Sequence, residues 1–173
     1  MSALLGPHGA WRYLGGYLEA DGQPFRLEPR EIDTAGPGES LEIDGLRVDA
    51  VGVPHGPVPA LGYVVHVGGA RVAFTGDQRM DDPRFQTLAR GVDLLVAHHA
   101  IAEGSRGAAA NLHATPSEIG ALADAVDAGR LVLSHHMQRA LAERDAGLAA
   151  IAARYGGPVA LADDLDCYPL GGS

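Results

Sequence analysis

Polar side chains able to bind metals follow four apolar runs of the sequence, each where a strand is expected to end. They are His55, Asp77, the pair His98–His99 and the pair His135–His136. Because sites in α/β proteins form beyond the carboxyl ends of strands, we expect these side chains to converge. Imidazole and carboxylate groups are ligands of zinc, iron and manganese, and a carboxylate between two imidazoles can bridge two metals. The pattern therefore favours a metal site that supports a hydrolytic displacement.

Each of these residues, taken singly, also fits a structural role. A histidine at a strand end often bonds to nearby backbone, and we favour that interpretation for His66, inside an expected hairpin strand. Residues 75–77 could form a simple turn, since Gly-Asp is common turn chemistry. His113 could be no more than a polar residue ahead of a helix cap. The combination of these residues, together with the family resemblance described below, favours the functional interpretation.

The elements expected to position these residues are two hairpins followed by alternating strands and helices. Asp44–Gly45 and Gly68–Gly69 are hairpin turn dipeptides between apolar segments. Thr115, Pro116 and Glu118 form the start signature of a helix that Gly129 is expected to end. The other expected elements are helices at 11–18, 83–89 and 142–155 and strands at 93–97, 131–133, 159–161 and 166–168. This order predicts an α/β fold with a mixed β-sheet and flanking helices.

Length and composition fit one folded domain and exclude several classes of protein. The chain has 173 residues, of which 46% are hydrophobic, as is typical of globular domains. Its net charge of −9 makes nucleic-acid binding unfavourable, because that affinity needs clustered cations. The single cysteine, Cys167, excludes an internal disulfide and is expected to be buried. The sequence contains no apolar run of membrane-spanning length and no recognisable signal peptide, so we expect a cytoplasmic location without membrane contact.

Residues 41–170 resemble the second half of the metallo-β-lactamase-fold hydrolases. The motifs are most similar to those of the ribonuclease Z-like and arylsulfatase-like branches. Four matching segments lie in family order, at 53–63, 74–77, 112–116 and 131–135, and their key residues are 22, 36 and 22 residues apart. The resemblance implies a poorly defined segment at 1–40 and a domain at 41–173 that forms the C-terminal half of an αββα sandwich.

The resemblance also implies a role for each residue at the strand ends. His55 would bind a first metal, His135 would bind a second, and Asp77 would bridge both and share in catalysis. His113 would donate a proton to the leaving group or stabilise the transferred oxygen. One of His98 and His99 would orient a ligand without touching the metal. The implied cofactor is a divalent metal, zinc first with manganese or iron as alternatives, whose bound hydroxide attacks an ester or phosphodiester.

One signature of this family is missing. The motif His-x-His-x-Asp-His supplies most of the metal ligands in relatives, and no His-x-His occurs in this sequence. The chain is therefore expected to be half of a larger fold that holds up to two metals only when the missing half is supplied. An uncovered sheet face predicts a homo-oligomer, such as a dimer, or a partner chain that covers it.

Two functions stay open at this point. The first is a metal-dependent hydrolase of small-molecule esters or phosphodiesters, incomplete without the missing ligands. Transfer-RNA processing is disfavoured, because the chain is acidic and only 21 residues separate His55 from Asp77, too few for a clamping arm. The second is a catalytically inactive remnant that serves as an interaction or structural module.

Overall fold

The computed structural model describes residues 8, 9, 11–18, 26 and 28–170, and the chain divides into two units. The units comprise residues 1–31 and 32–173, and each is described by itself. In the first unit, Arg12–Leu18 forms a 3₁₀-helix, η1, which confirms the short helix predicted at 11–18. No helix within the described ranges has the length and apolar character needed to cross a bilayer.

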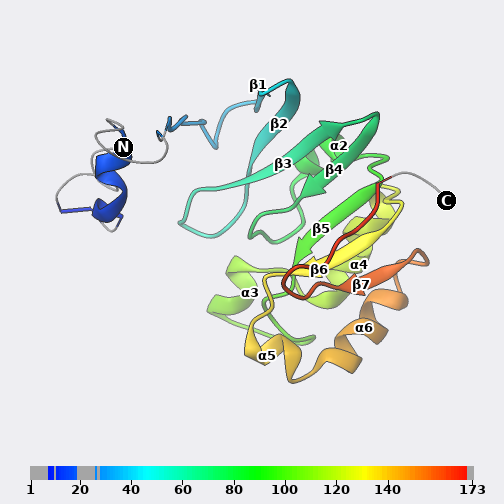
Figure 1. The fold of residues 1–173 in the computed structure, drawn as a ribbon. Helices are drawn as coiled ribbons and strands as arrows, with labels where there is room; N and C mark the ends of the chain where they lie inside the picture. Colours follow the sequence, from blue (N-terminus) through cyan, green and yellow to red (C-terminus); the bar gives the residue numbers. More distant parts are fainter. Residues whose placement is uncertain (1–7, 10, 19–25, 27, 171–173) are drawn as a thin grey trace. The chain divides into compact units, whose positions relative to one another are not determined.

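The second unit is built on a seven-stranded sheet whose strands lie side by side in sequence order (Figure 1). The strands are β1 (Glu39–Ile43), β2 (Leu46–Val53), β3 (Ala60–Val67), β4 (Ala70–Phe74), β5 (Leu94–His98), β6 (Leu131–Ser134) and β7 (Val159–Leu161). Strands β1 to β4 pair antiparallel and β4 to β7 pair parallel. Asp44–Gly45 and Gly68–Gly69 close the predicted hairpins with positive φ at every residue. The predicted mixed sheet is confirmed, and β2, β4, β5 and β6 end at the same edge.

The part of the chain that the structure describes contains five α-helices. They are α2 (Pro83–Leu88), α3 (Ala108–Leu112), α4 (Pro116–Ala125), α5 (Gln138–Leu141) and α6 (Arg144–Ala152). The helix predicted to open at Thr115 is confirmed, and the Glu118 carboxylate accepts the Thr115 backbone N–H at 2.8 Å. It ends before the predicted Gly129, because Asp127 has a φ of 53° and the Ala128 N–H bonds back to the Ala123 carbonyl at 3.0 Å.

The helix predicted at 142–155 is confirmed as the shorter α6, which begins after Glu143, a residue with φ −117° and ψ 30° that separates it from α5. Two other predictions for the C-terminal third are wrong. The strand expected at 166–168 does not form, since Asp166 closes a local turn on Asp163 through its backbone N–H at 3.2 Å and its carboxylate at 3.0 Å. Cys167 follows this turn outside the sheet and is exposed instead of buried.

One face of the sheet carries the main core. Val64, Ala73, Leu95 and Leu133 from the central strands are fully buried there, together with Phe85 of α2, Ile119 of α4 and Ile151 of α6. Gly62 permits the close approach of α2, because a Cβ at that position would lie 2.5 Å from the Phe85 ring. Burial of these side chains fixes the central strands and thereby the positions of their carboxyl ends.

The opposite face of the sheet is less covered. Its small buried cluster consists of Val72, Leu94 and Val132, and no described helix contributes to that cluster. Tyr168 from the C-terminal segment packs against it. Phe74, at the end of β4, remains 41% exposed. The less covered face therefore extends to the sheet edge where the predicted site residues lie.

Candidate metal centre

His55, Asp77 and His113 come together at the carboxyl edge of the sheet. His55 follows β2, Asp77 follows β4 and His113 caps the C-terminus of α3. One potential ligand atom from each of these three residues lies within 4.8 Å of the other two. Two imidazoles and a carboxylate at this separation form a donor set suited to a divalent metal such as zinc.

The hydrogen bond of His55 leaves one of its ring nitrogens available. Its Nδ1 lies 2.8 Å from the backbone carbonyl of Leu112. Because a carbonyl can only accept, Nδ1 carries the proton and Nε2 keeps its lone pair. Metal-binding histidines commonly donate their second nitrogen in this way, which fixes both tautomer and ring orientation. The bond also ties His55 to the residue that precedes His113.

The His113 imidazole is buried and has no fixed partner. The residue is 8% exposed, and its Nδ1 has no hydrogen-bond partner in the described part of the chain. Its ring centroid lies 5.1 Å from that of His55 and 5.3 Å from that of His98. Burial lowers the pKa of His113, although the Asp77 carboxylate acts in the opposite direction. A neutral imidazole with an unpaired buried nitrogen fits a metal or a substrate oxygen beside it.

His135 reaches the same carboxylate from the end of β6. Its Nε2 lies 3.5 Å from Oδ2 of Asp77, and its side chain is 55% exposed. His135 has a positive φ of 51°, a conformation that is uncommon outside glycine. Two of the predicted metal ligands, His55 and His135, thus lie near the carboxylate of the third, Asp77, but His135 is not part of the three-donor cluster.

His98 links the segments that carry Asp77 and His113. Its Nδ1 donates to the Gly76 carbonyl at 2.9 Å, and its Nε2 accepts the Ala114 N–H at 3.4 Å. Burial lowers the pKa of His98 to about 4, so the ring is neutral at pH 7 and can donate and accept at once. Gly76 itself has a φ of 60°, and a Cβ there would lie 2.3 Å from the Leu61 carbonyl oxygen. This turn therefore requires glycine.

His99 points away from the cluster. Its Nδ1 lies 3.1 Å from Nδ1 of His136, whose Nε2 lies 3.2 Å from the Ala162 carbonyl. Of the two residues proposed to orient a ligand, His98 has the contacts for that role and His99 does not. The sequence interpretation gave no role to His136 and overlooked the fully buried Gln78 beside Asp77, whose Nε2 donates to the Thr75 carbonyl at 2.7 Å. Adjacency to His135 and Asp77 was the only sequence signal for either residue.

The cluster borders a cavity on the less covered face of the sheet. This cavity has a volume of about 360 Å³. Its polar lining residues include Asp77, His98 and His135, and its apolar lining residues include Tyr63, Phe74 and Val96. The site thus opens toward the sheet face that no described helix covers, and it offers room for a small molecule.

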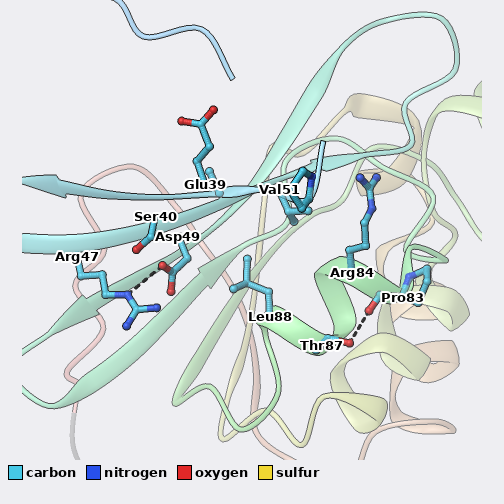
Figure 2. A pocket seen from close by; sticks show the side chains of 12 residues that line it. Glu39, Ser40, Arg47, Asp49, Val51, Pro83, Arg84, Thr87 and Leu88 are labelled. Atoms are coloured by element: carbon cyan, nitrogen blue, oxygen red, sulfur yellow. Dashed lines mark hydrogen bonds and ion pairs between the residues drawn. The ribbon is translucent and has the colours of Figure 1, made fainter. Parts of the chain in front are cut away.

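A larger cavity, of about 580 Å³, lies apart from the cluster of His55, Asp77 and His113, between the β1–β2 hairpin and α2 (Figure 2). In it, the Asp49 carboxylate accepts hydrogen bonds from Arg47 at 3.0 Å and from His66 at 2.8 Å. Burial raises the pKa of Asp49, but hydrogen bonds from Ser40, Arg47 and His66 outweigh it and hold the pKa at about 2. His66 therefore bonds to a carboxylate instead of to backbone as predicted. The larger cavity is not where the metal-binding side chains gather.

Sequence comparison matches residues 5–136 to one family, described as the Beta-lactamase superfamily domain. A search of curated protein sequences finds no match. The family match covers most of the chain and includes His55, Asp77, His113 and His135.

Solved structures with the metallo-β-lactamase fold resemble this chain. The fold protein YhfI from Bacillus subtilis superposes with a TM-score of 0.68 at 19% identity, covering 87% of this chain and 58% of YhfI. Zinc-bound PqqB from Methylobacterium extorquens gives a TM-score of 0.56 at 21% identity, covering 75% of this chain and 53% of PqqB. A diphosphatase of the PhnP family gives a TM-score of 0.52 at 19% identity, and the superposition covers 74% of this chain and 44% of the diphosphatase. The chain thus shares their fold and spans little more than half of YhfI and PqqB.

Proposed function

Because this chain belongs to the beta-lactamase superfamily, we propose that it works as a metal-dependent hydrolase of a small ester or phosphodiester. The observation that carries the proposal is the convergence of His55, Asp77 and His113 donors within 4.8 Å. His135 adds a fourth group at 3.5 Å from Asp77. The diphosphatase among the proteins of similar fold supports a phosphodiester as one of the two proposed substrate classes.

In this proposal His55, Asp77 and His135 are the metal ligands in the complete site. A bound divalent metal, zinc or alternatively manganese or iron, supplies Lewis acidity and activates water. His55 offers Nε2 because its Nδ1 is committed to Leu112. His113 holds a proton near the leaving group, and its burial keeps bulk water from that proton.

The ligand count supports a need for a further chain. Zinc sites in proteins have three or four protein ligands for each metal, and two metals would need more than these residues provide. The apolar wall of Tyr63, Phe74 and Val96 stands beside the metal ligands. We propose that a second copy or a partner chain covers this wall and brings the missing ligands. The net charge of −9 and the small cavity favour a small-molecule substrate over nucleic acid.

The test is hydrolysis of bis(p-nitrophenyl) phosphate and p-nitrophenyl acetate in the presence of Zn²⁺ or Mn²⁺. Activity should depend on the metal and should rise more than linearly with protein concentration if a second copy completes the site. His55→Ala and Asp77→Asn should abolish it, whereas His66→Gln, a histidine change outside the cluster, should not. Metal-independent turnover, or equal activity in Asp77→Asn, would refute the proposal.

The second candidate function is an inactive interaction module. The observation that favours it is the 41% exposure of Phe74 on a sheet face without a covering helix. In that case Phe74→Asp should abolish association in analytical ultracentrifugation, while His55→Ala should leave association intact and no substrate should be hydrolysed. The two sets of variants therefore separate the two functions.

A further inference from the structure

The three donors that lie close enough to share one cation differ from the set that the family resemblance implies. Ligand atoms of His55, Asp77 and His113 lie within 4.8 Å of one another, and His135 is not among them. Ligands of a tetrahedral zinc ion lie about 3 to 4 Å apart, since each is about 2 Å from the metal. Small rotations of these side chains would close the cluster around an ion.

Within this set, His113 has a buried polar atom without a hydrogen-bond partner in the described part of the chain. It is 8% exposed, and its Nδ1 has no partner among the described residues. Buried polar atoms are nearly always paired, so an unpaired one points to a ligand that the protein atoms do not supply. Its neighbours in the cluster are a carboxylate and a second imidazole, and divalent metals such as zinc bind to both kinds of group.

Hydrogen bonds that involve no metal fix the backbone on both sides of His113. His55 donates to the carbonyl of Leu112 at 2.8 Å, and His98 accepts the N–H of Ala114 at 3.4 Å. The residues on both sides of His113 are thus tied to the segments that carry the other two donors. Such outer hydrogen bonds fix ligand geometry and strengthen metal binding.

His135 is positioned differently. Its side chain is 55% exposed, and its Nε2 approaches Oδ2 of Asp77 at 3.5 Å. An exposed imidazole beside a carboxylate can pair with it without any metal. Nothing in the surroundings of His135 corresponds to the unpaired buried nitrogen of His113.

We propose that this chain by itself binds one divalent cation through His55, Asp77 and His113, with His113 in the place that the family resemblance gives to His135. The inference rests on the metal dependence of the proposed function and adds a state of the site in which no second chain is present. Three protein ligands leave a position for water. In this state the coordinating nitrogen of His113 is bound to the metal and cannot protonate a leaving group, so metal binding alone does not make the chain an active hydrolase.

The experiment is titration of the metal-free full chain with Co²⁺, followed by its visible absorption and by calorimetry with Zn²⁺. One ion should bind per chain. Loss of an outer-shell partner typically lowers metal affinity about 10- to 100-fold, so His113→Ala, which removes a direct ligand, should lower it at least about 100-fold. His135→Ala discriminates between the two possible ligand sets, because His135 lies beside the same carboxylate; in the isolated chain it should change affinity less than about threefold.

Long-range ¹H–¹⁵N NMR of the unsubstituted chain gives a second measurement that needs no variant to fold. Zn²⁺ should shift ring nitrogens of His55 and His113 and leave those of His135 unchanged. A shift at His135 without one at His113, or the absence of any bound ion, would overturn the inference. Hydrolysis that requires His135 in a completed complex would still support the proposed function. Failure of this inference can therefore be distinguished from failure of the proposed function.

Discussion

His98 is expected to hold the site together without touching metal or substrate. The residue is 3% exposed and bridges the Gly76 carbonyl and the Ala114 N–H. Asparagine places its amide nitrogen near the position of Nδ1 and glutamine places its oxygen near Nε2. His98→Asn therefore keeps the bond to Gly76, His98→Gln keeps the bond to Ala114, and His98→Leu keeps neither.

The loss in free energy of unfolding can be estimated from these two hydrogen bonds. Each contributes about 1 kcal/mol, and leaving the fully buried Ala114 N–H without an acceptor costs about 1 to 3 kcal/mol more. We expect His98→Leu to lower the free energy of unfolding by about 3 kcal/mol at pH 7. His98→Gln and His98→Asn should each fall between that variant and the unsubstituted chain. The bond to Ala114, at 3.4 Å, is the longer and weaker one.

The pH dependence of this stability contribution is a more specific test than its size at pH 7. Burial lowers the pKa of His98 from 6.5 to about 4, so the unfolded chain binds a proton there more readily than the folded chain does. This contribution to stability is present above pH 6.5 and is lost as the pH falls from 6.5 to about 4. Between about pH 7.5 and about pH 5 the loss is about 2 kcal/mol, and His98→Asn does not undergo it.

Urea unfolding of the metal-free proteins at these two pH values is the measurement. The stability difference between the unsubstituted chain and His98→Asn should shrink by about 2 kcal/mol at the lower pH. His99 and His113 also have lowered pKa values, but both remain in both proteins, so their contributions cancel in the difference. A difference that is the same at both pH values would refute the argument that a buried neutral imidazole bridges the two segments.

Three further substitutions, one of them paired with a control, test the structural framework by urea unfolding. Gly76→Ala should destabilise by more than about 2 kcal/mol, because its Cβ would lie 2.3 Å from the Leu61 carbonyl, whereas Gly68→Ala, with positive φ but open space, should cost only about 1 kcal/mol. Asp49→Asn should cost about 2 kcal/mol at pH 7, and that cost should vanish as the pH falls from 3.8 to about 2; a constant cost would contradict the assigned pKa. Glu118→Ala should cost about 1 kcal/mol, and no effect would exclude a capping role.

The hairpins and the start of α4 could be predicted because their signals are local. Asp44–Gly45 and Gly68–Gly69 accept positive φ at both turn positions, which few other dipeptides do. Glu118 lies three residues after Thr115 and bonds to its backbone, as the sequence spacing predicts. The strand ends followed from these elements, and with them the convergence of His55 and Asp77.

The features that were missed depend on contacts between distant residues or on a single backbone angle. Asp127 ends α4 with a φ of 53°, although glycine is the usual residue there and Gly129 is two positions away. Asp166 turns back on Asp163 where the apolar pattern favoured a strand. The pairing of His66 with Asp49 spans 17 residues and requires the β2–β3 register, which the sequence alone does not determine.

The two adjacent histidine pairs show how strand geometry assigns roles that composition cannot. Successive side chains of a strand point to opposite faces, so His98 at the end of β5 turns to Gly76 while His99 turns to His136. The supports of the cluster, the Leu112 carbonyl, the Gly76 carbonyl and His98, all belong to this chain. These supports therefore hold His55, Asp77 and His113 without a contribution from another chain. Under the proposals made above, a metal would bind to this chain first and a second chain would complete the site afterwards.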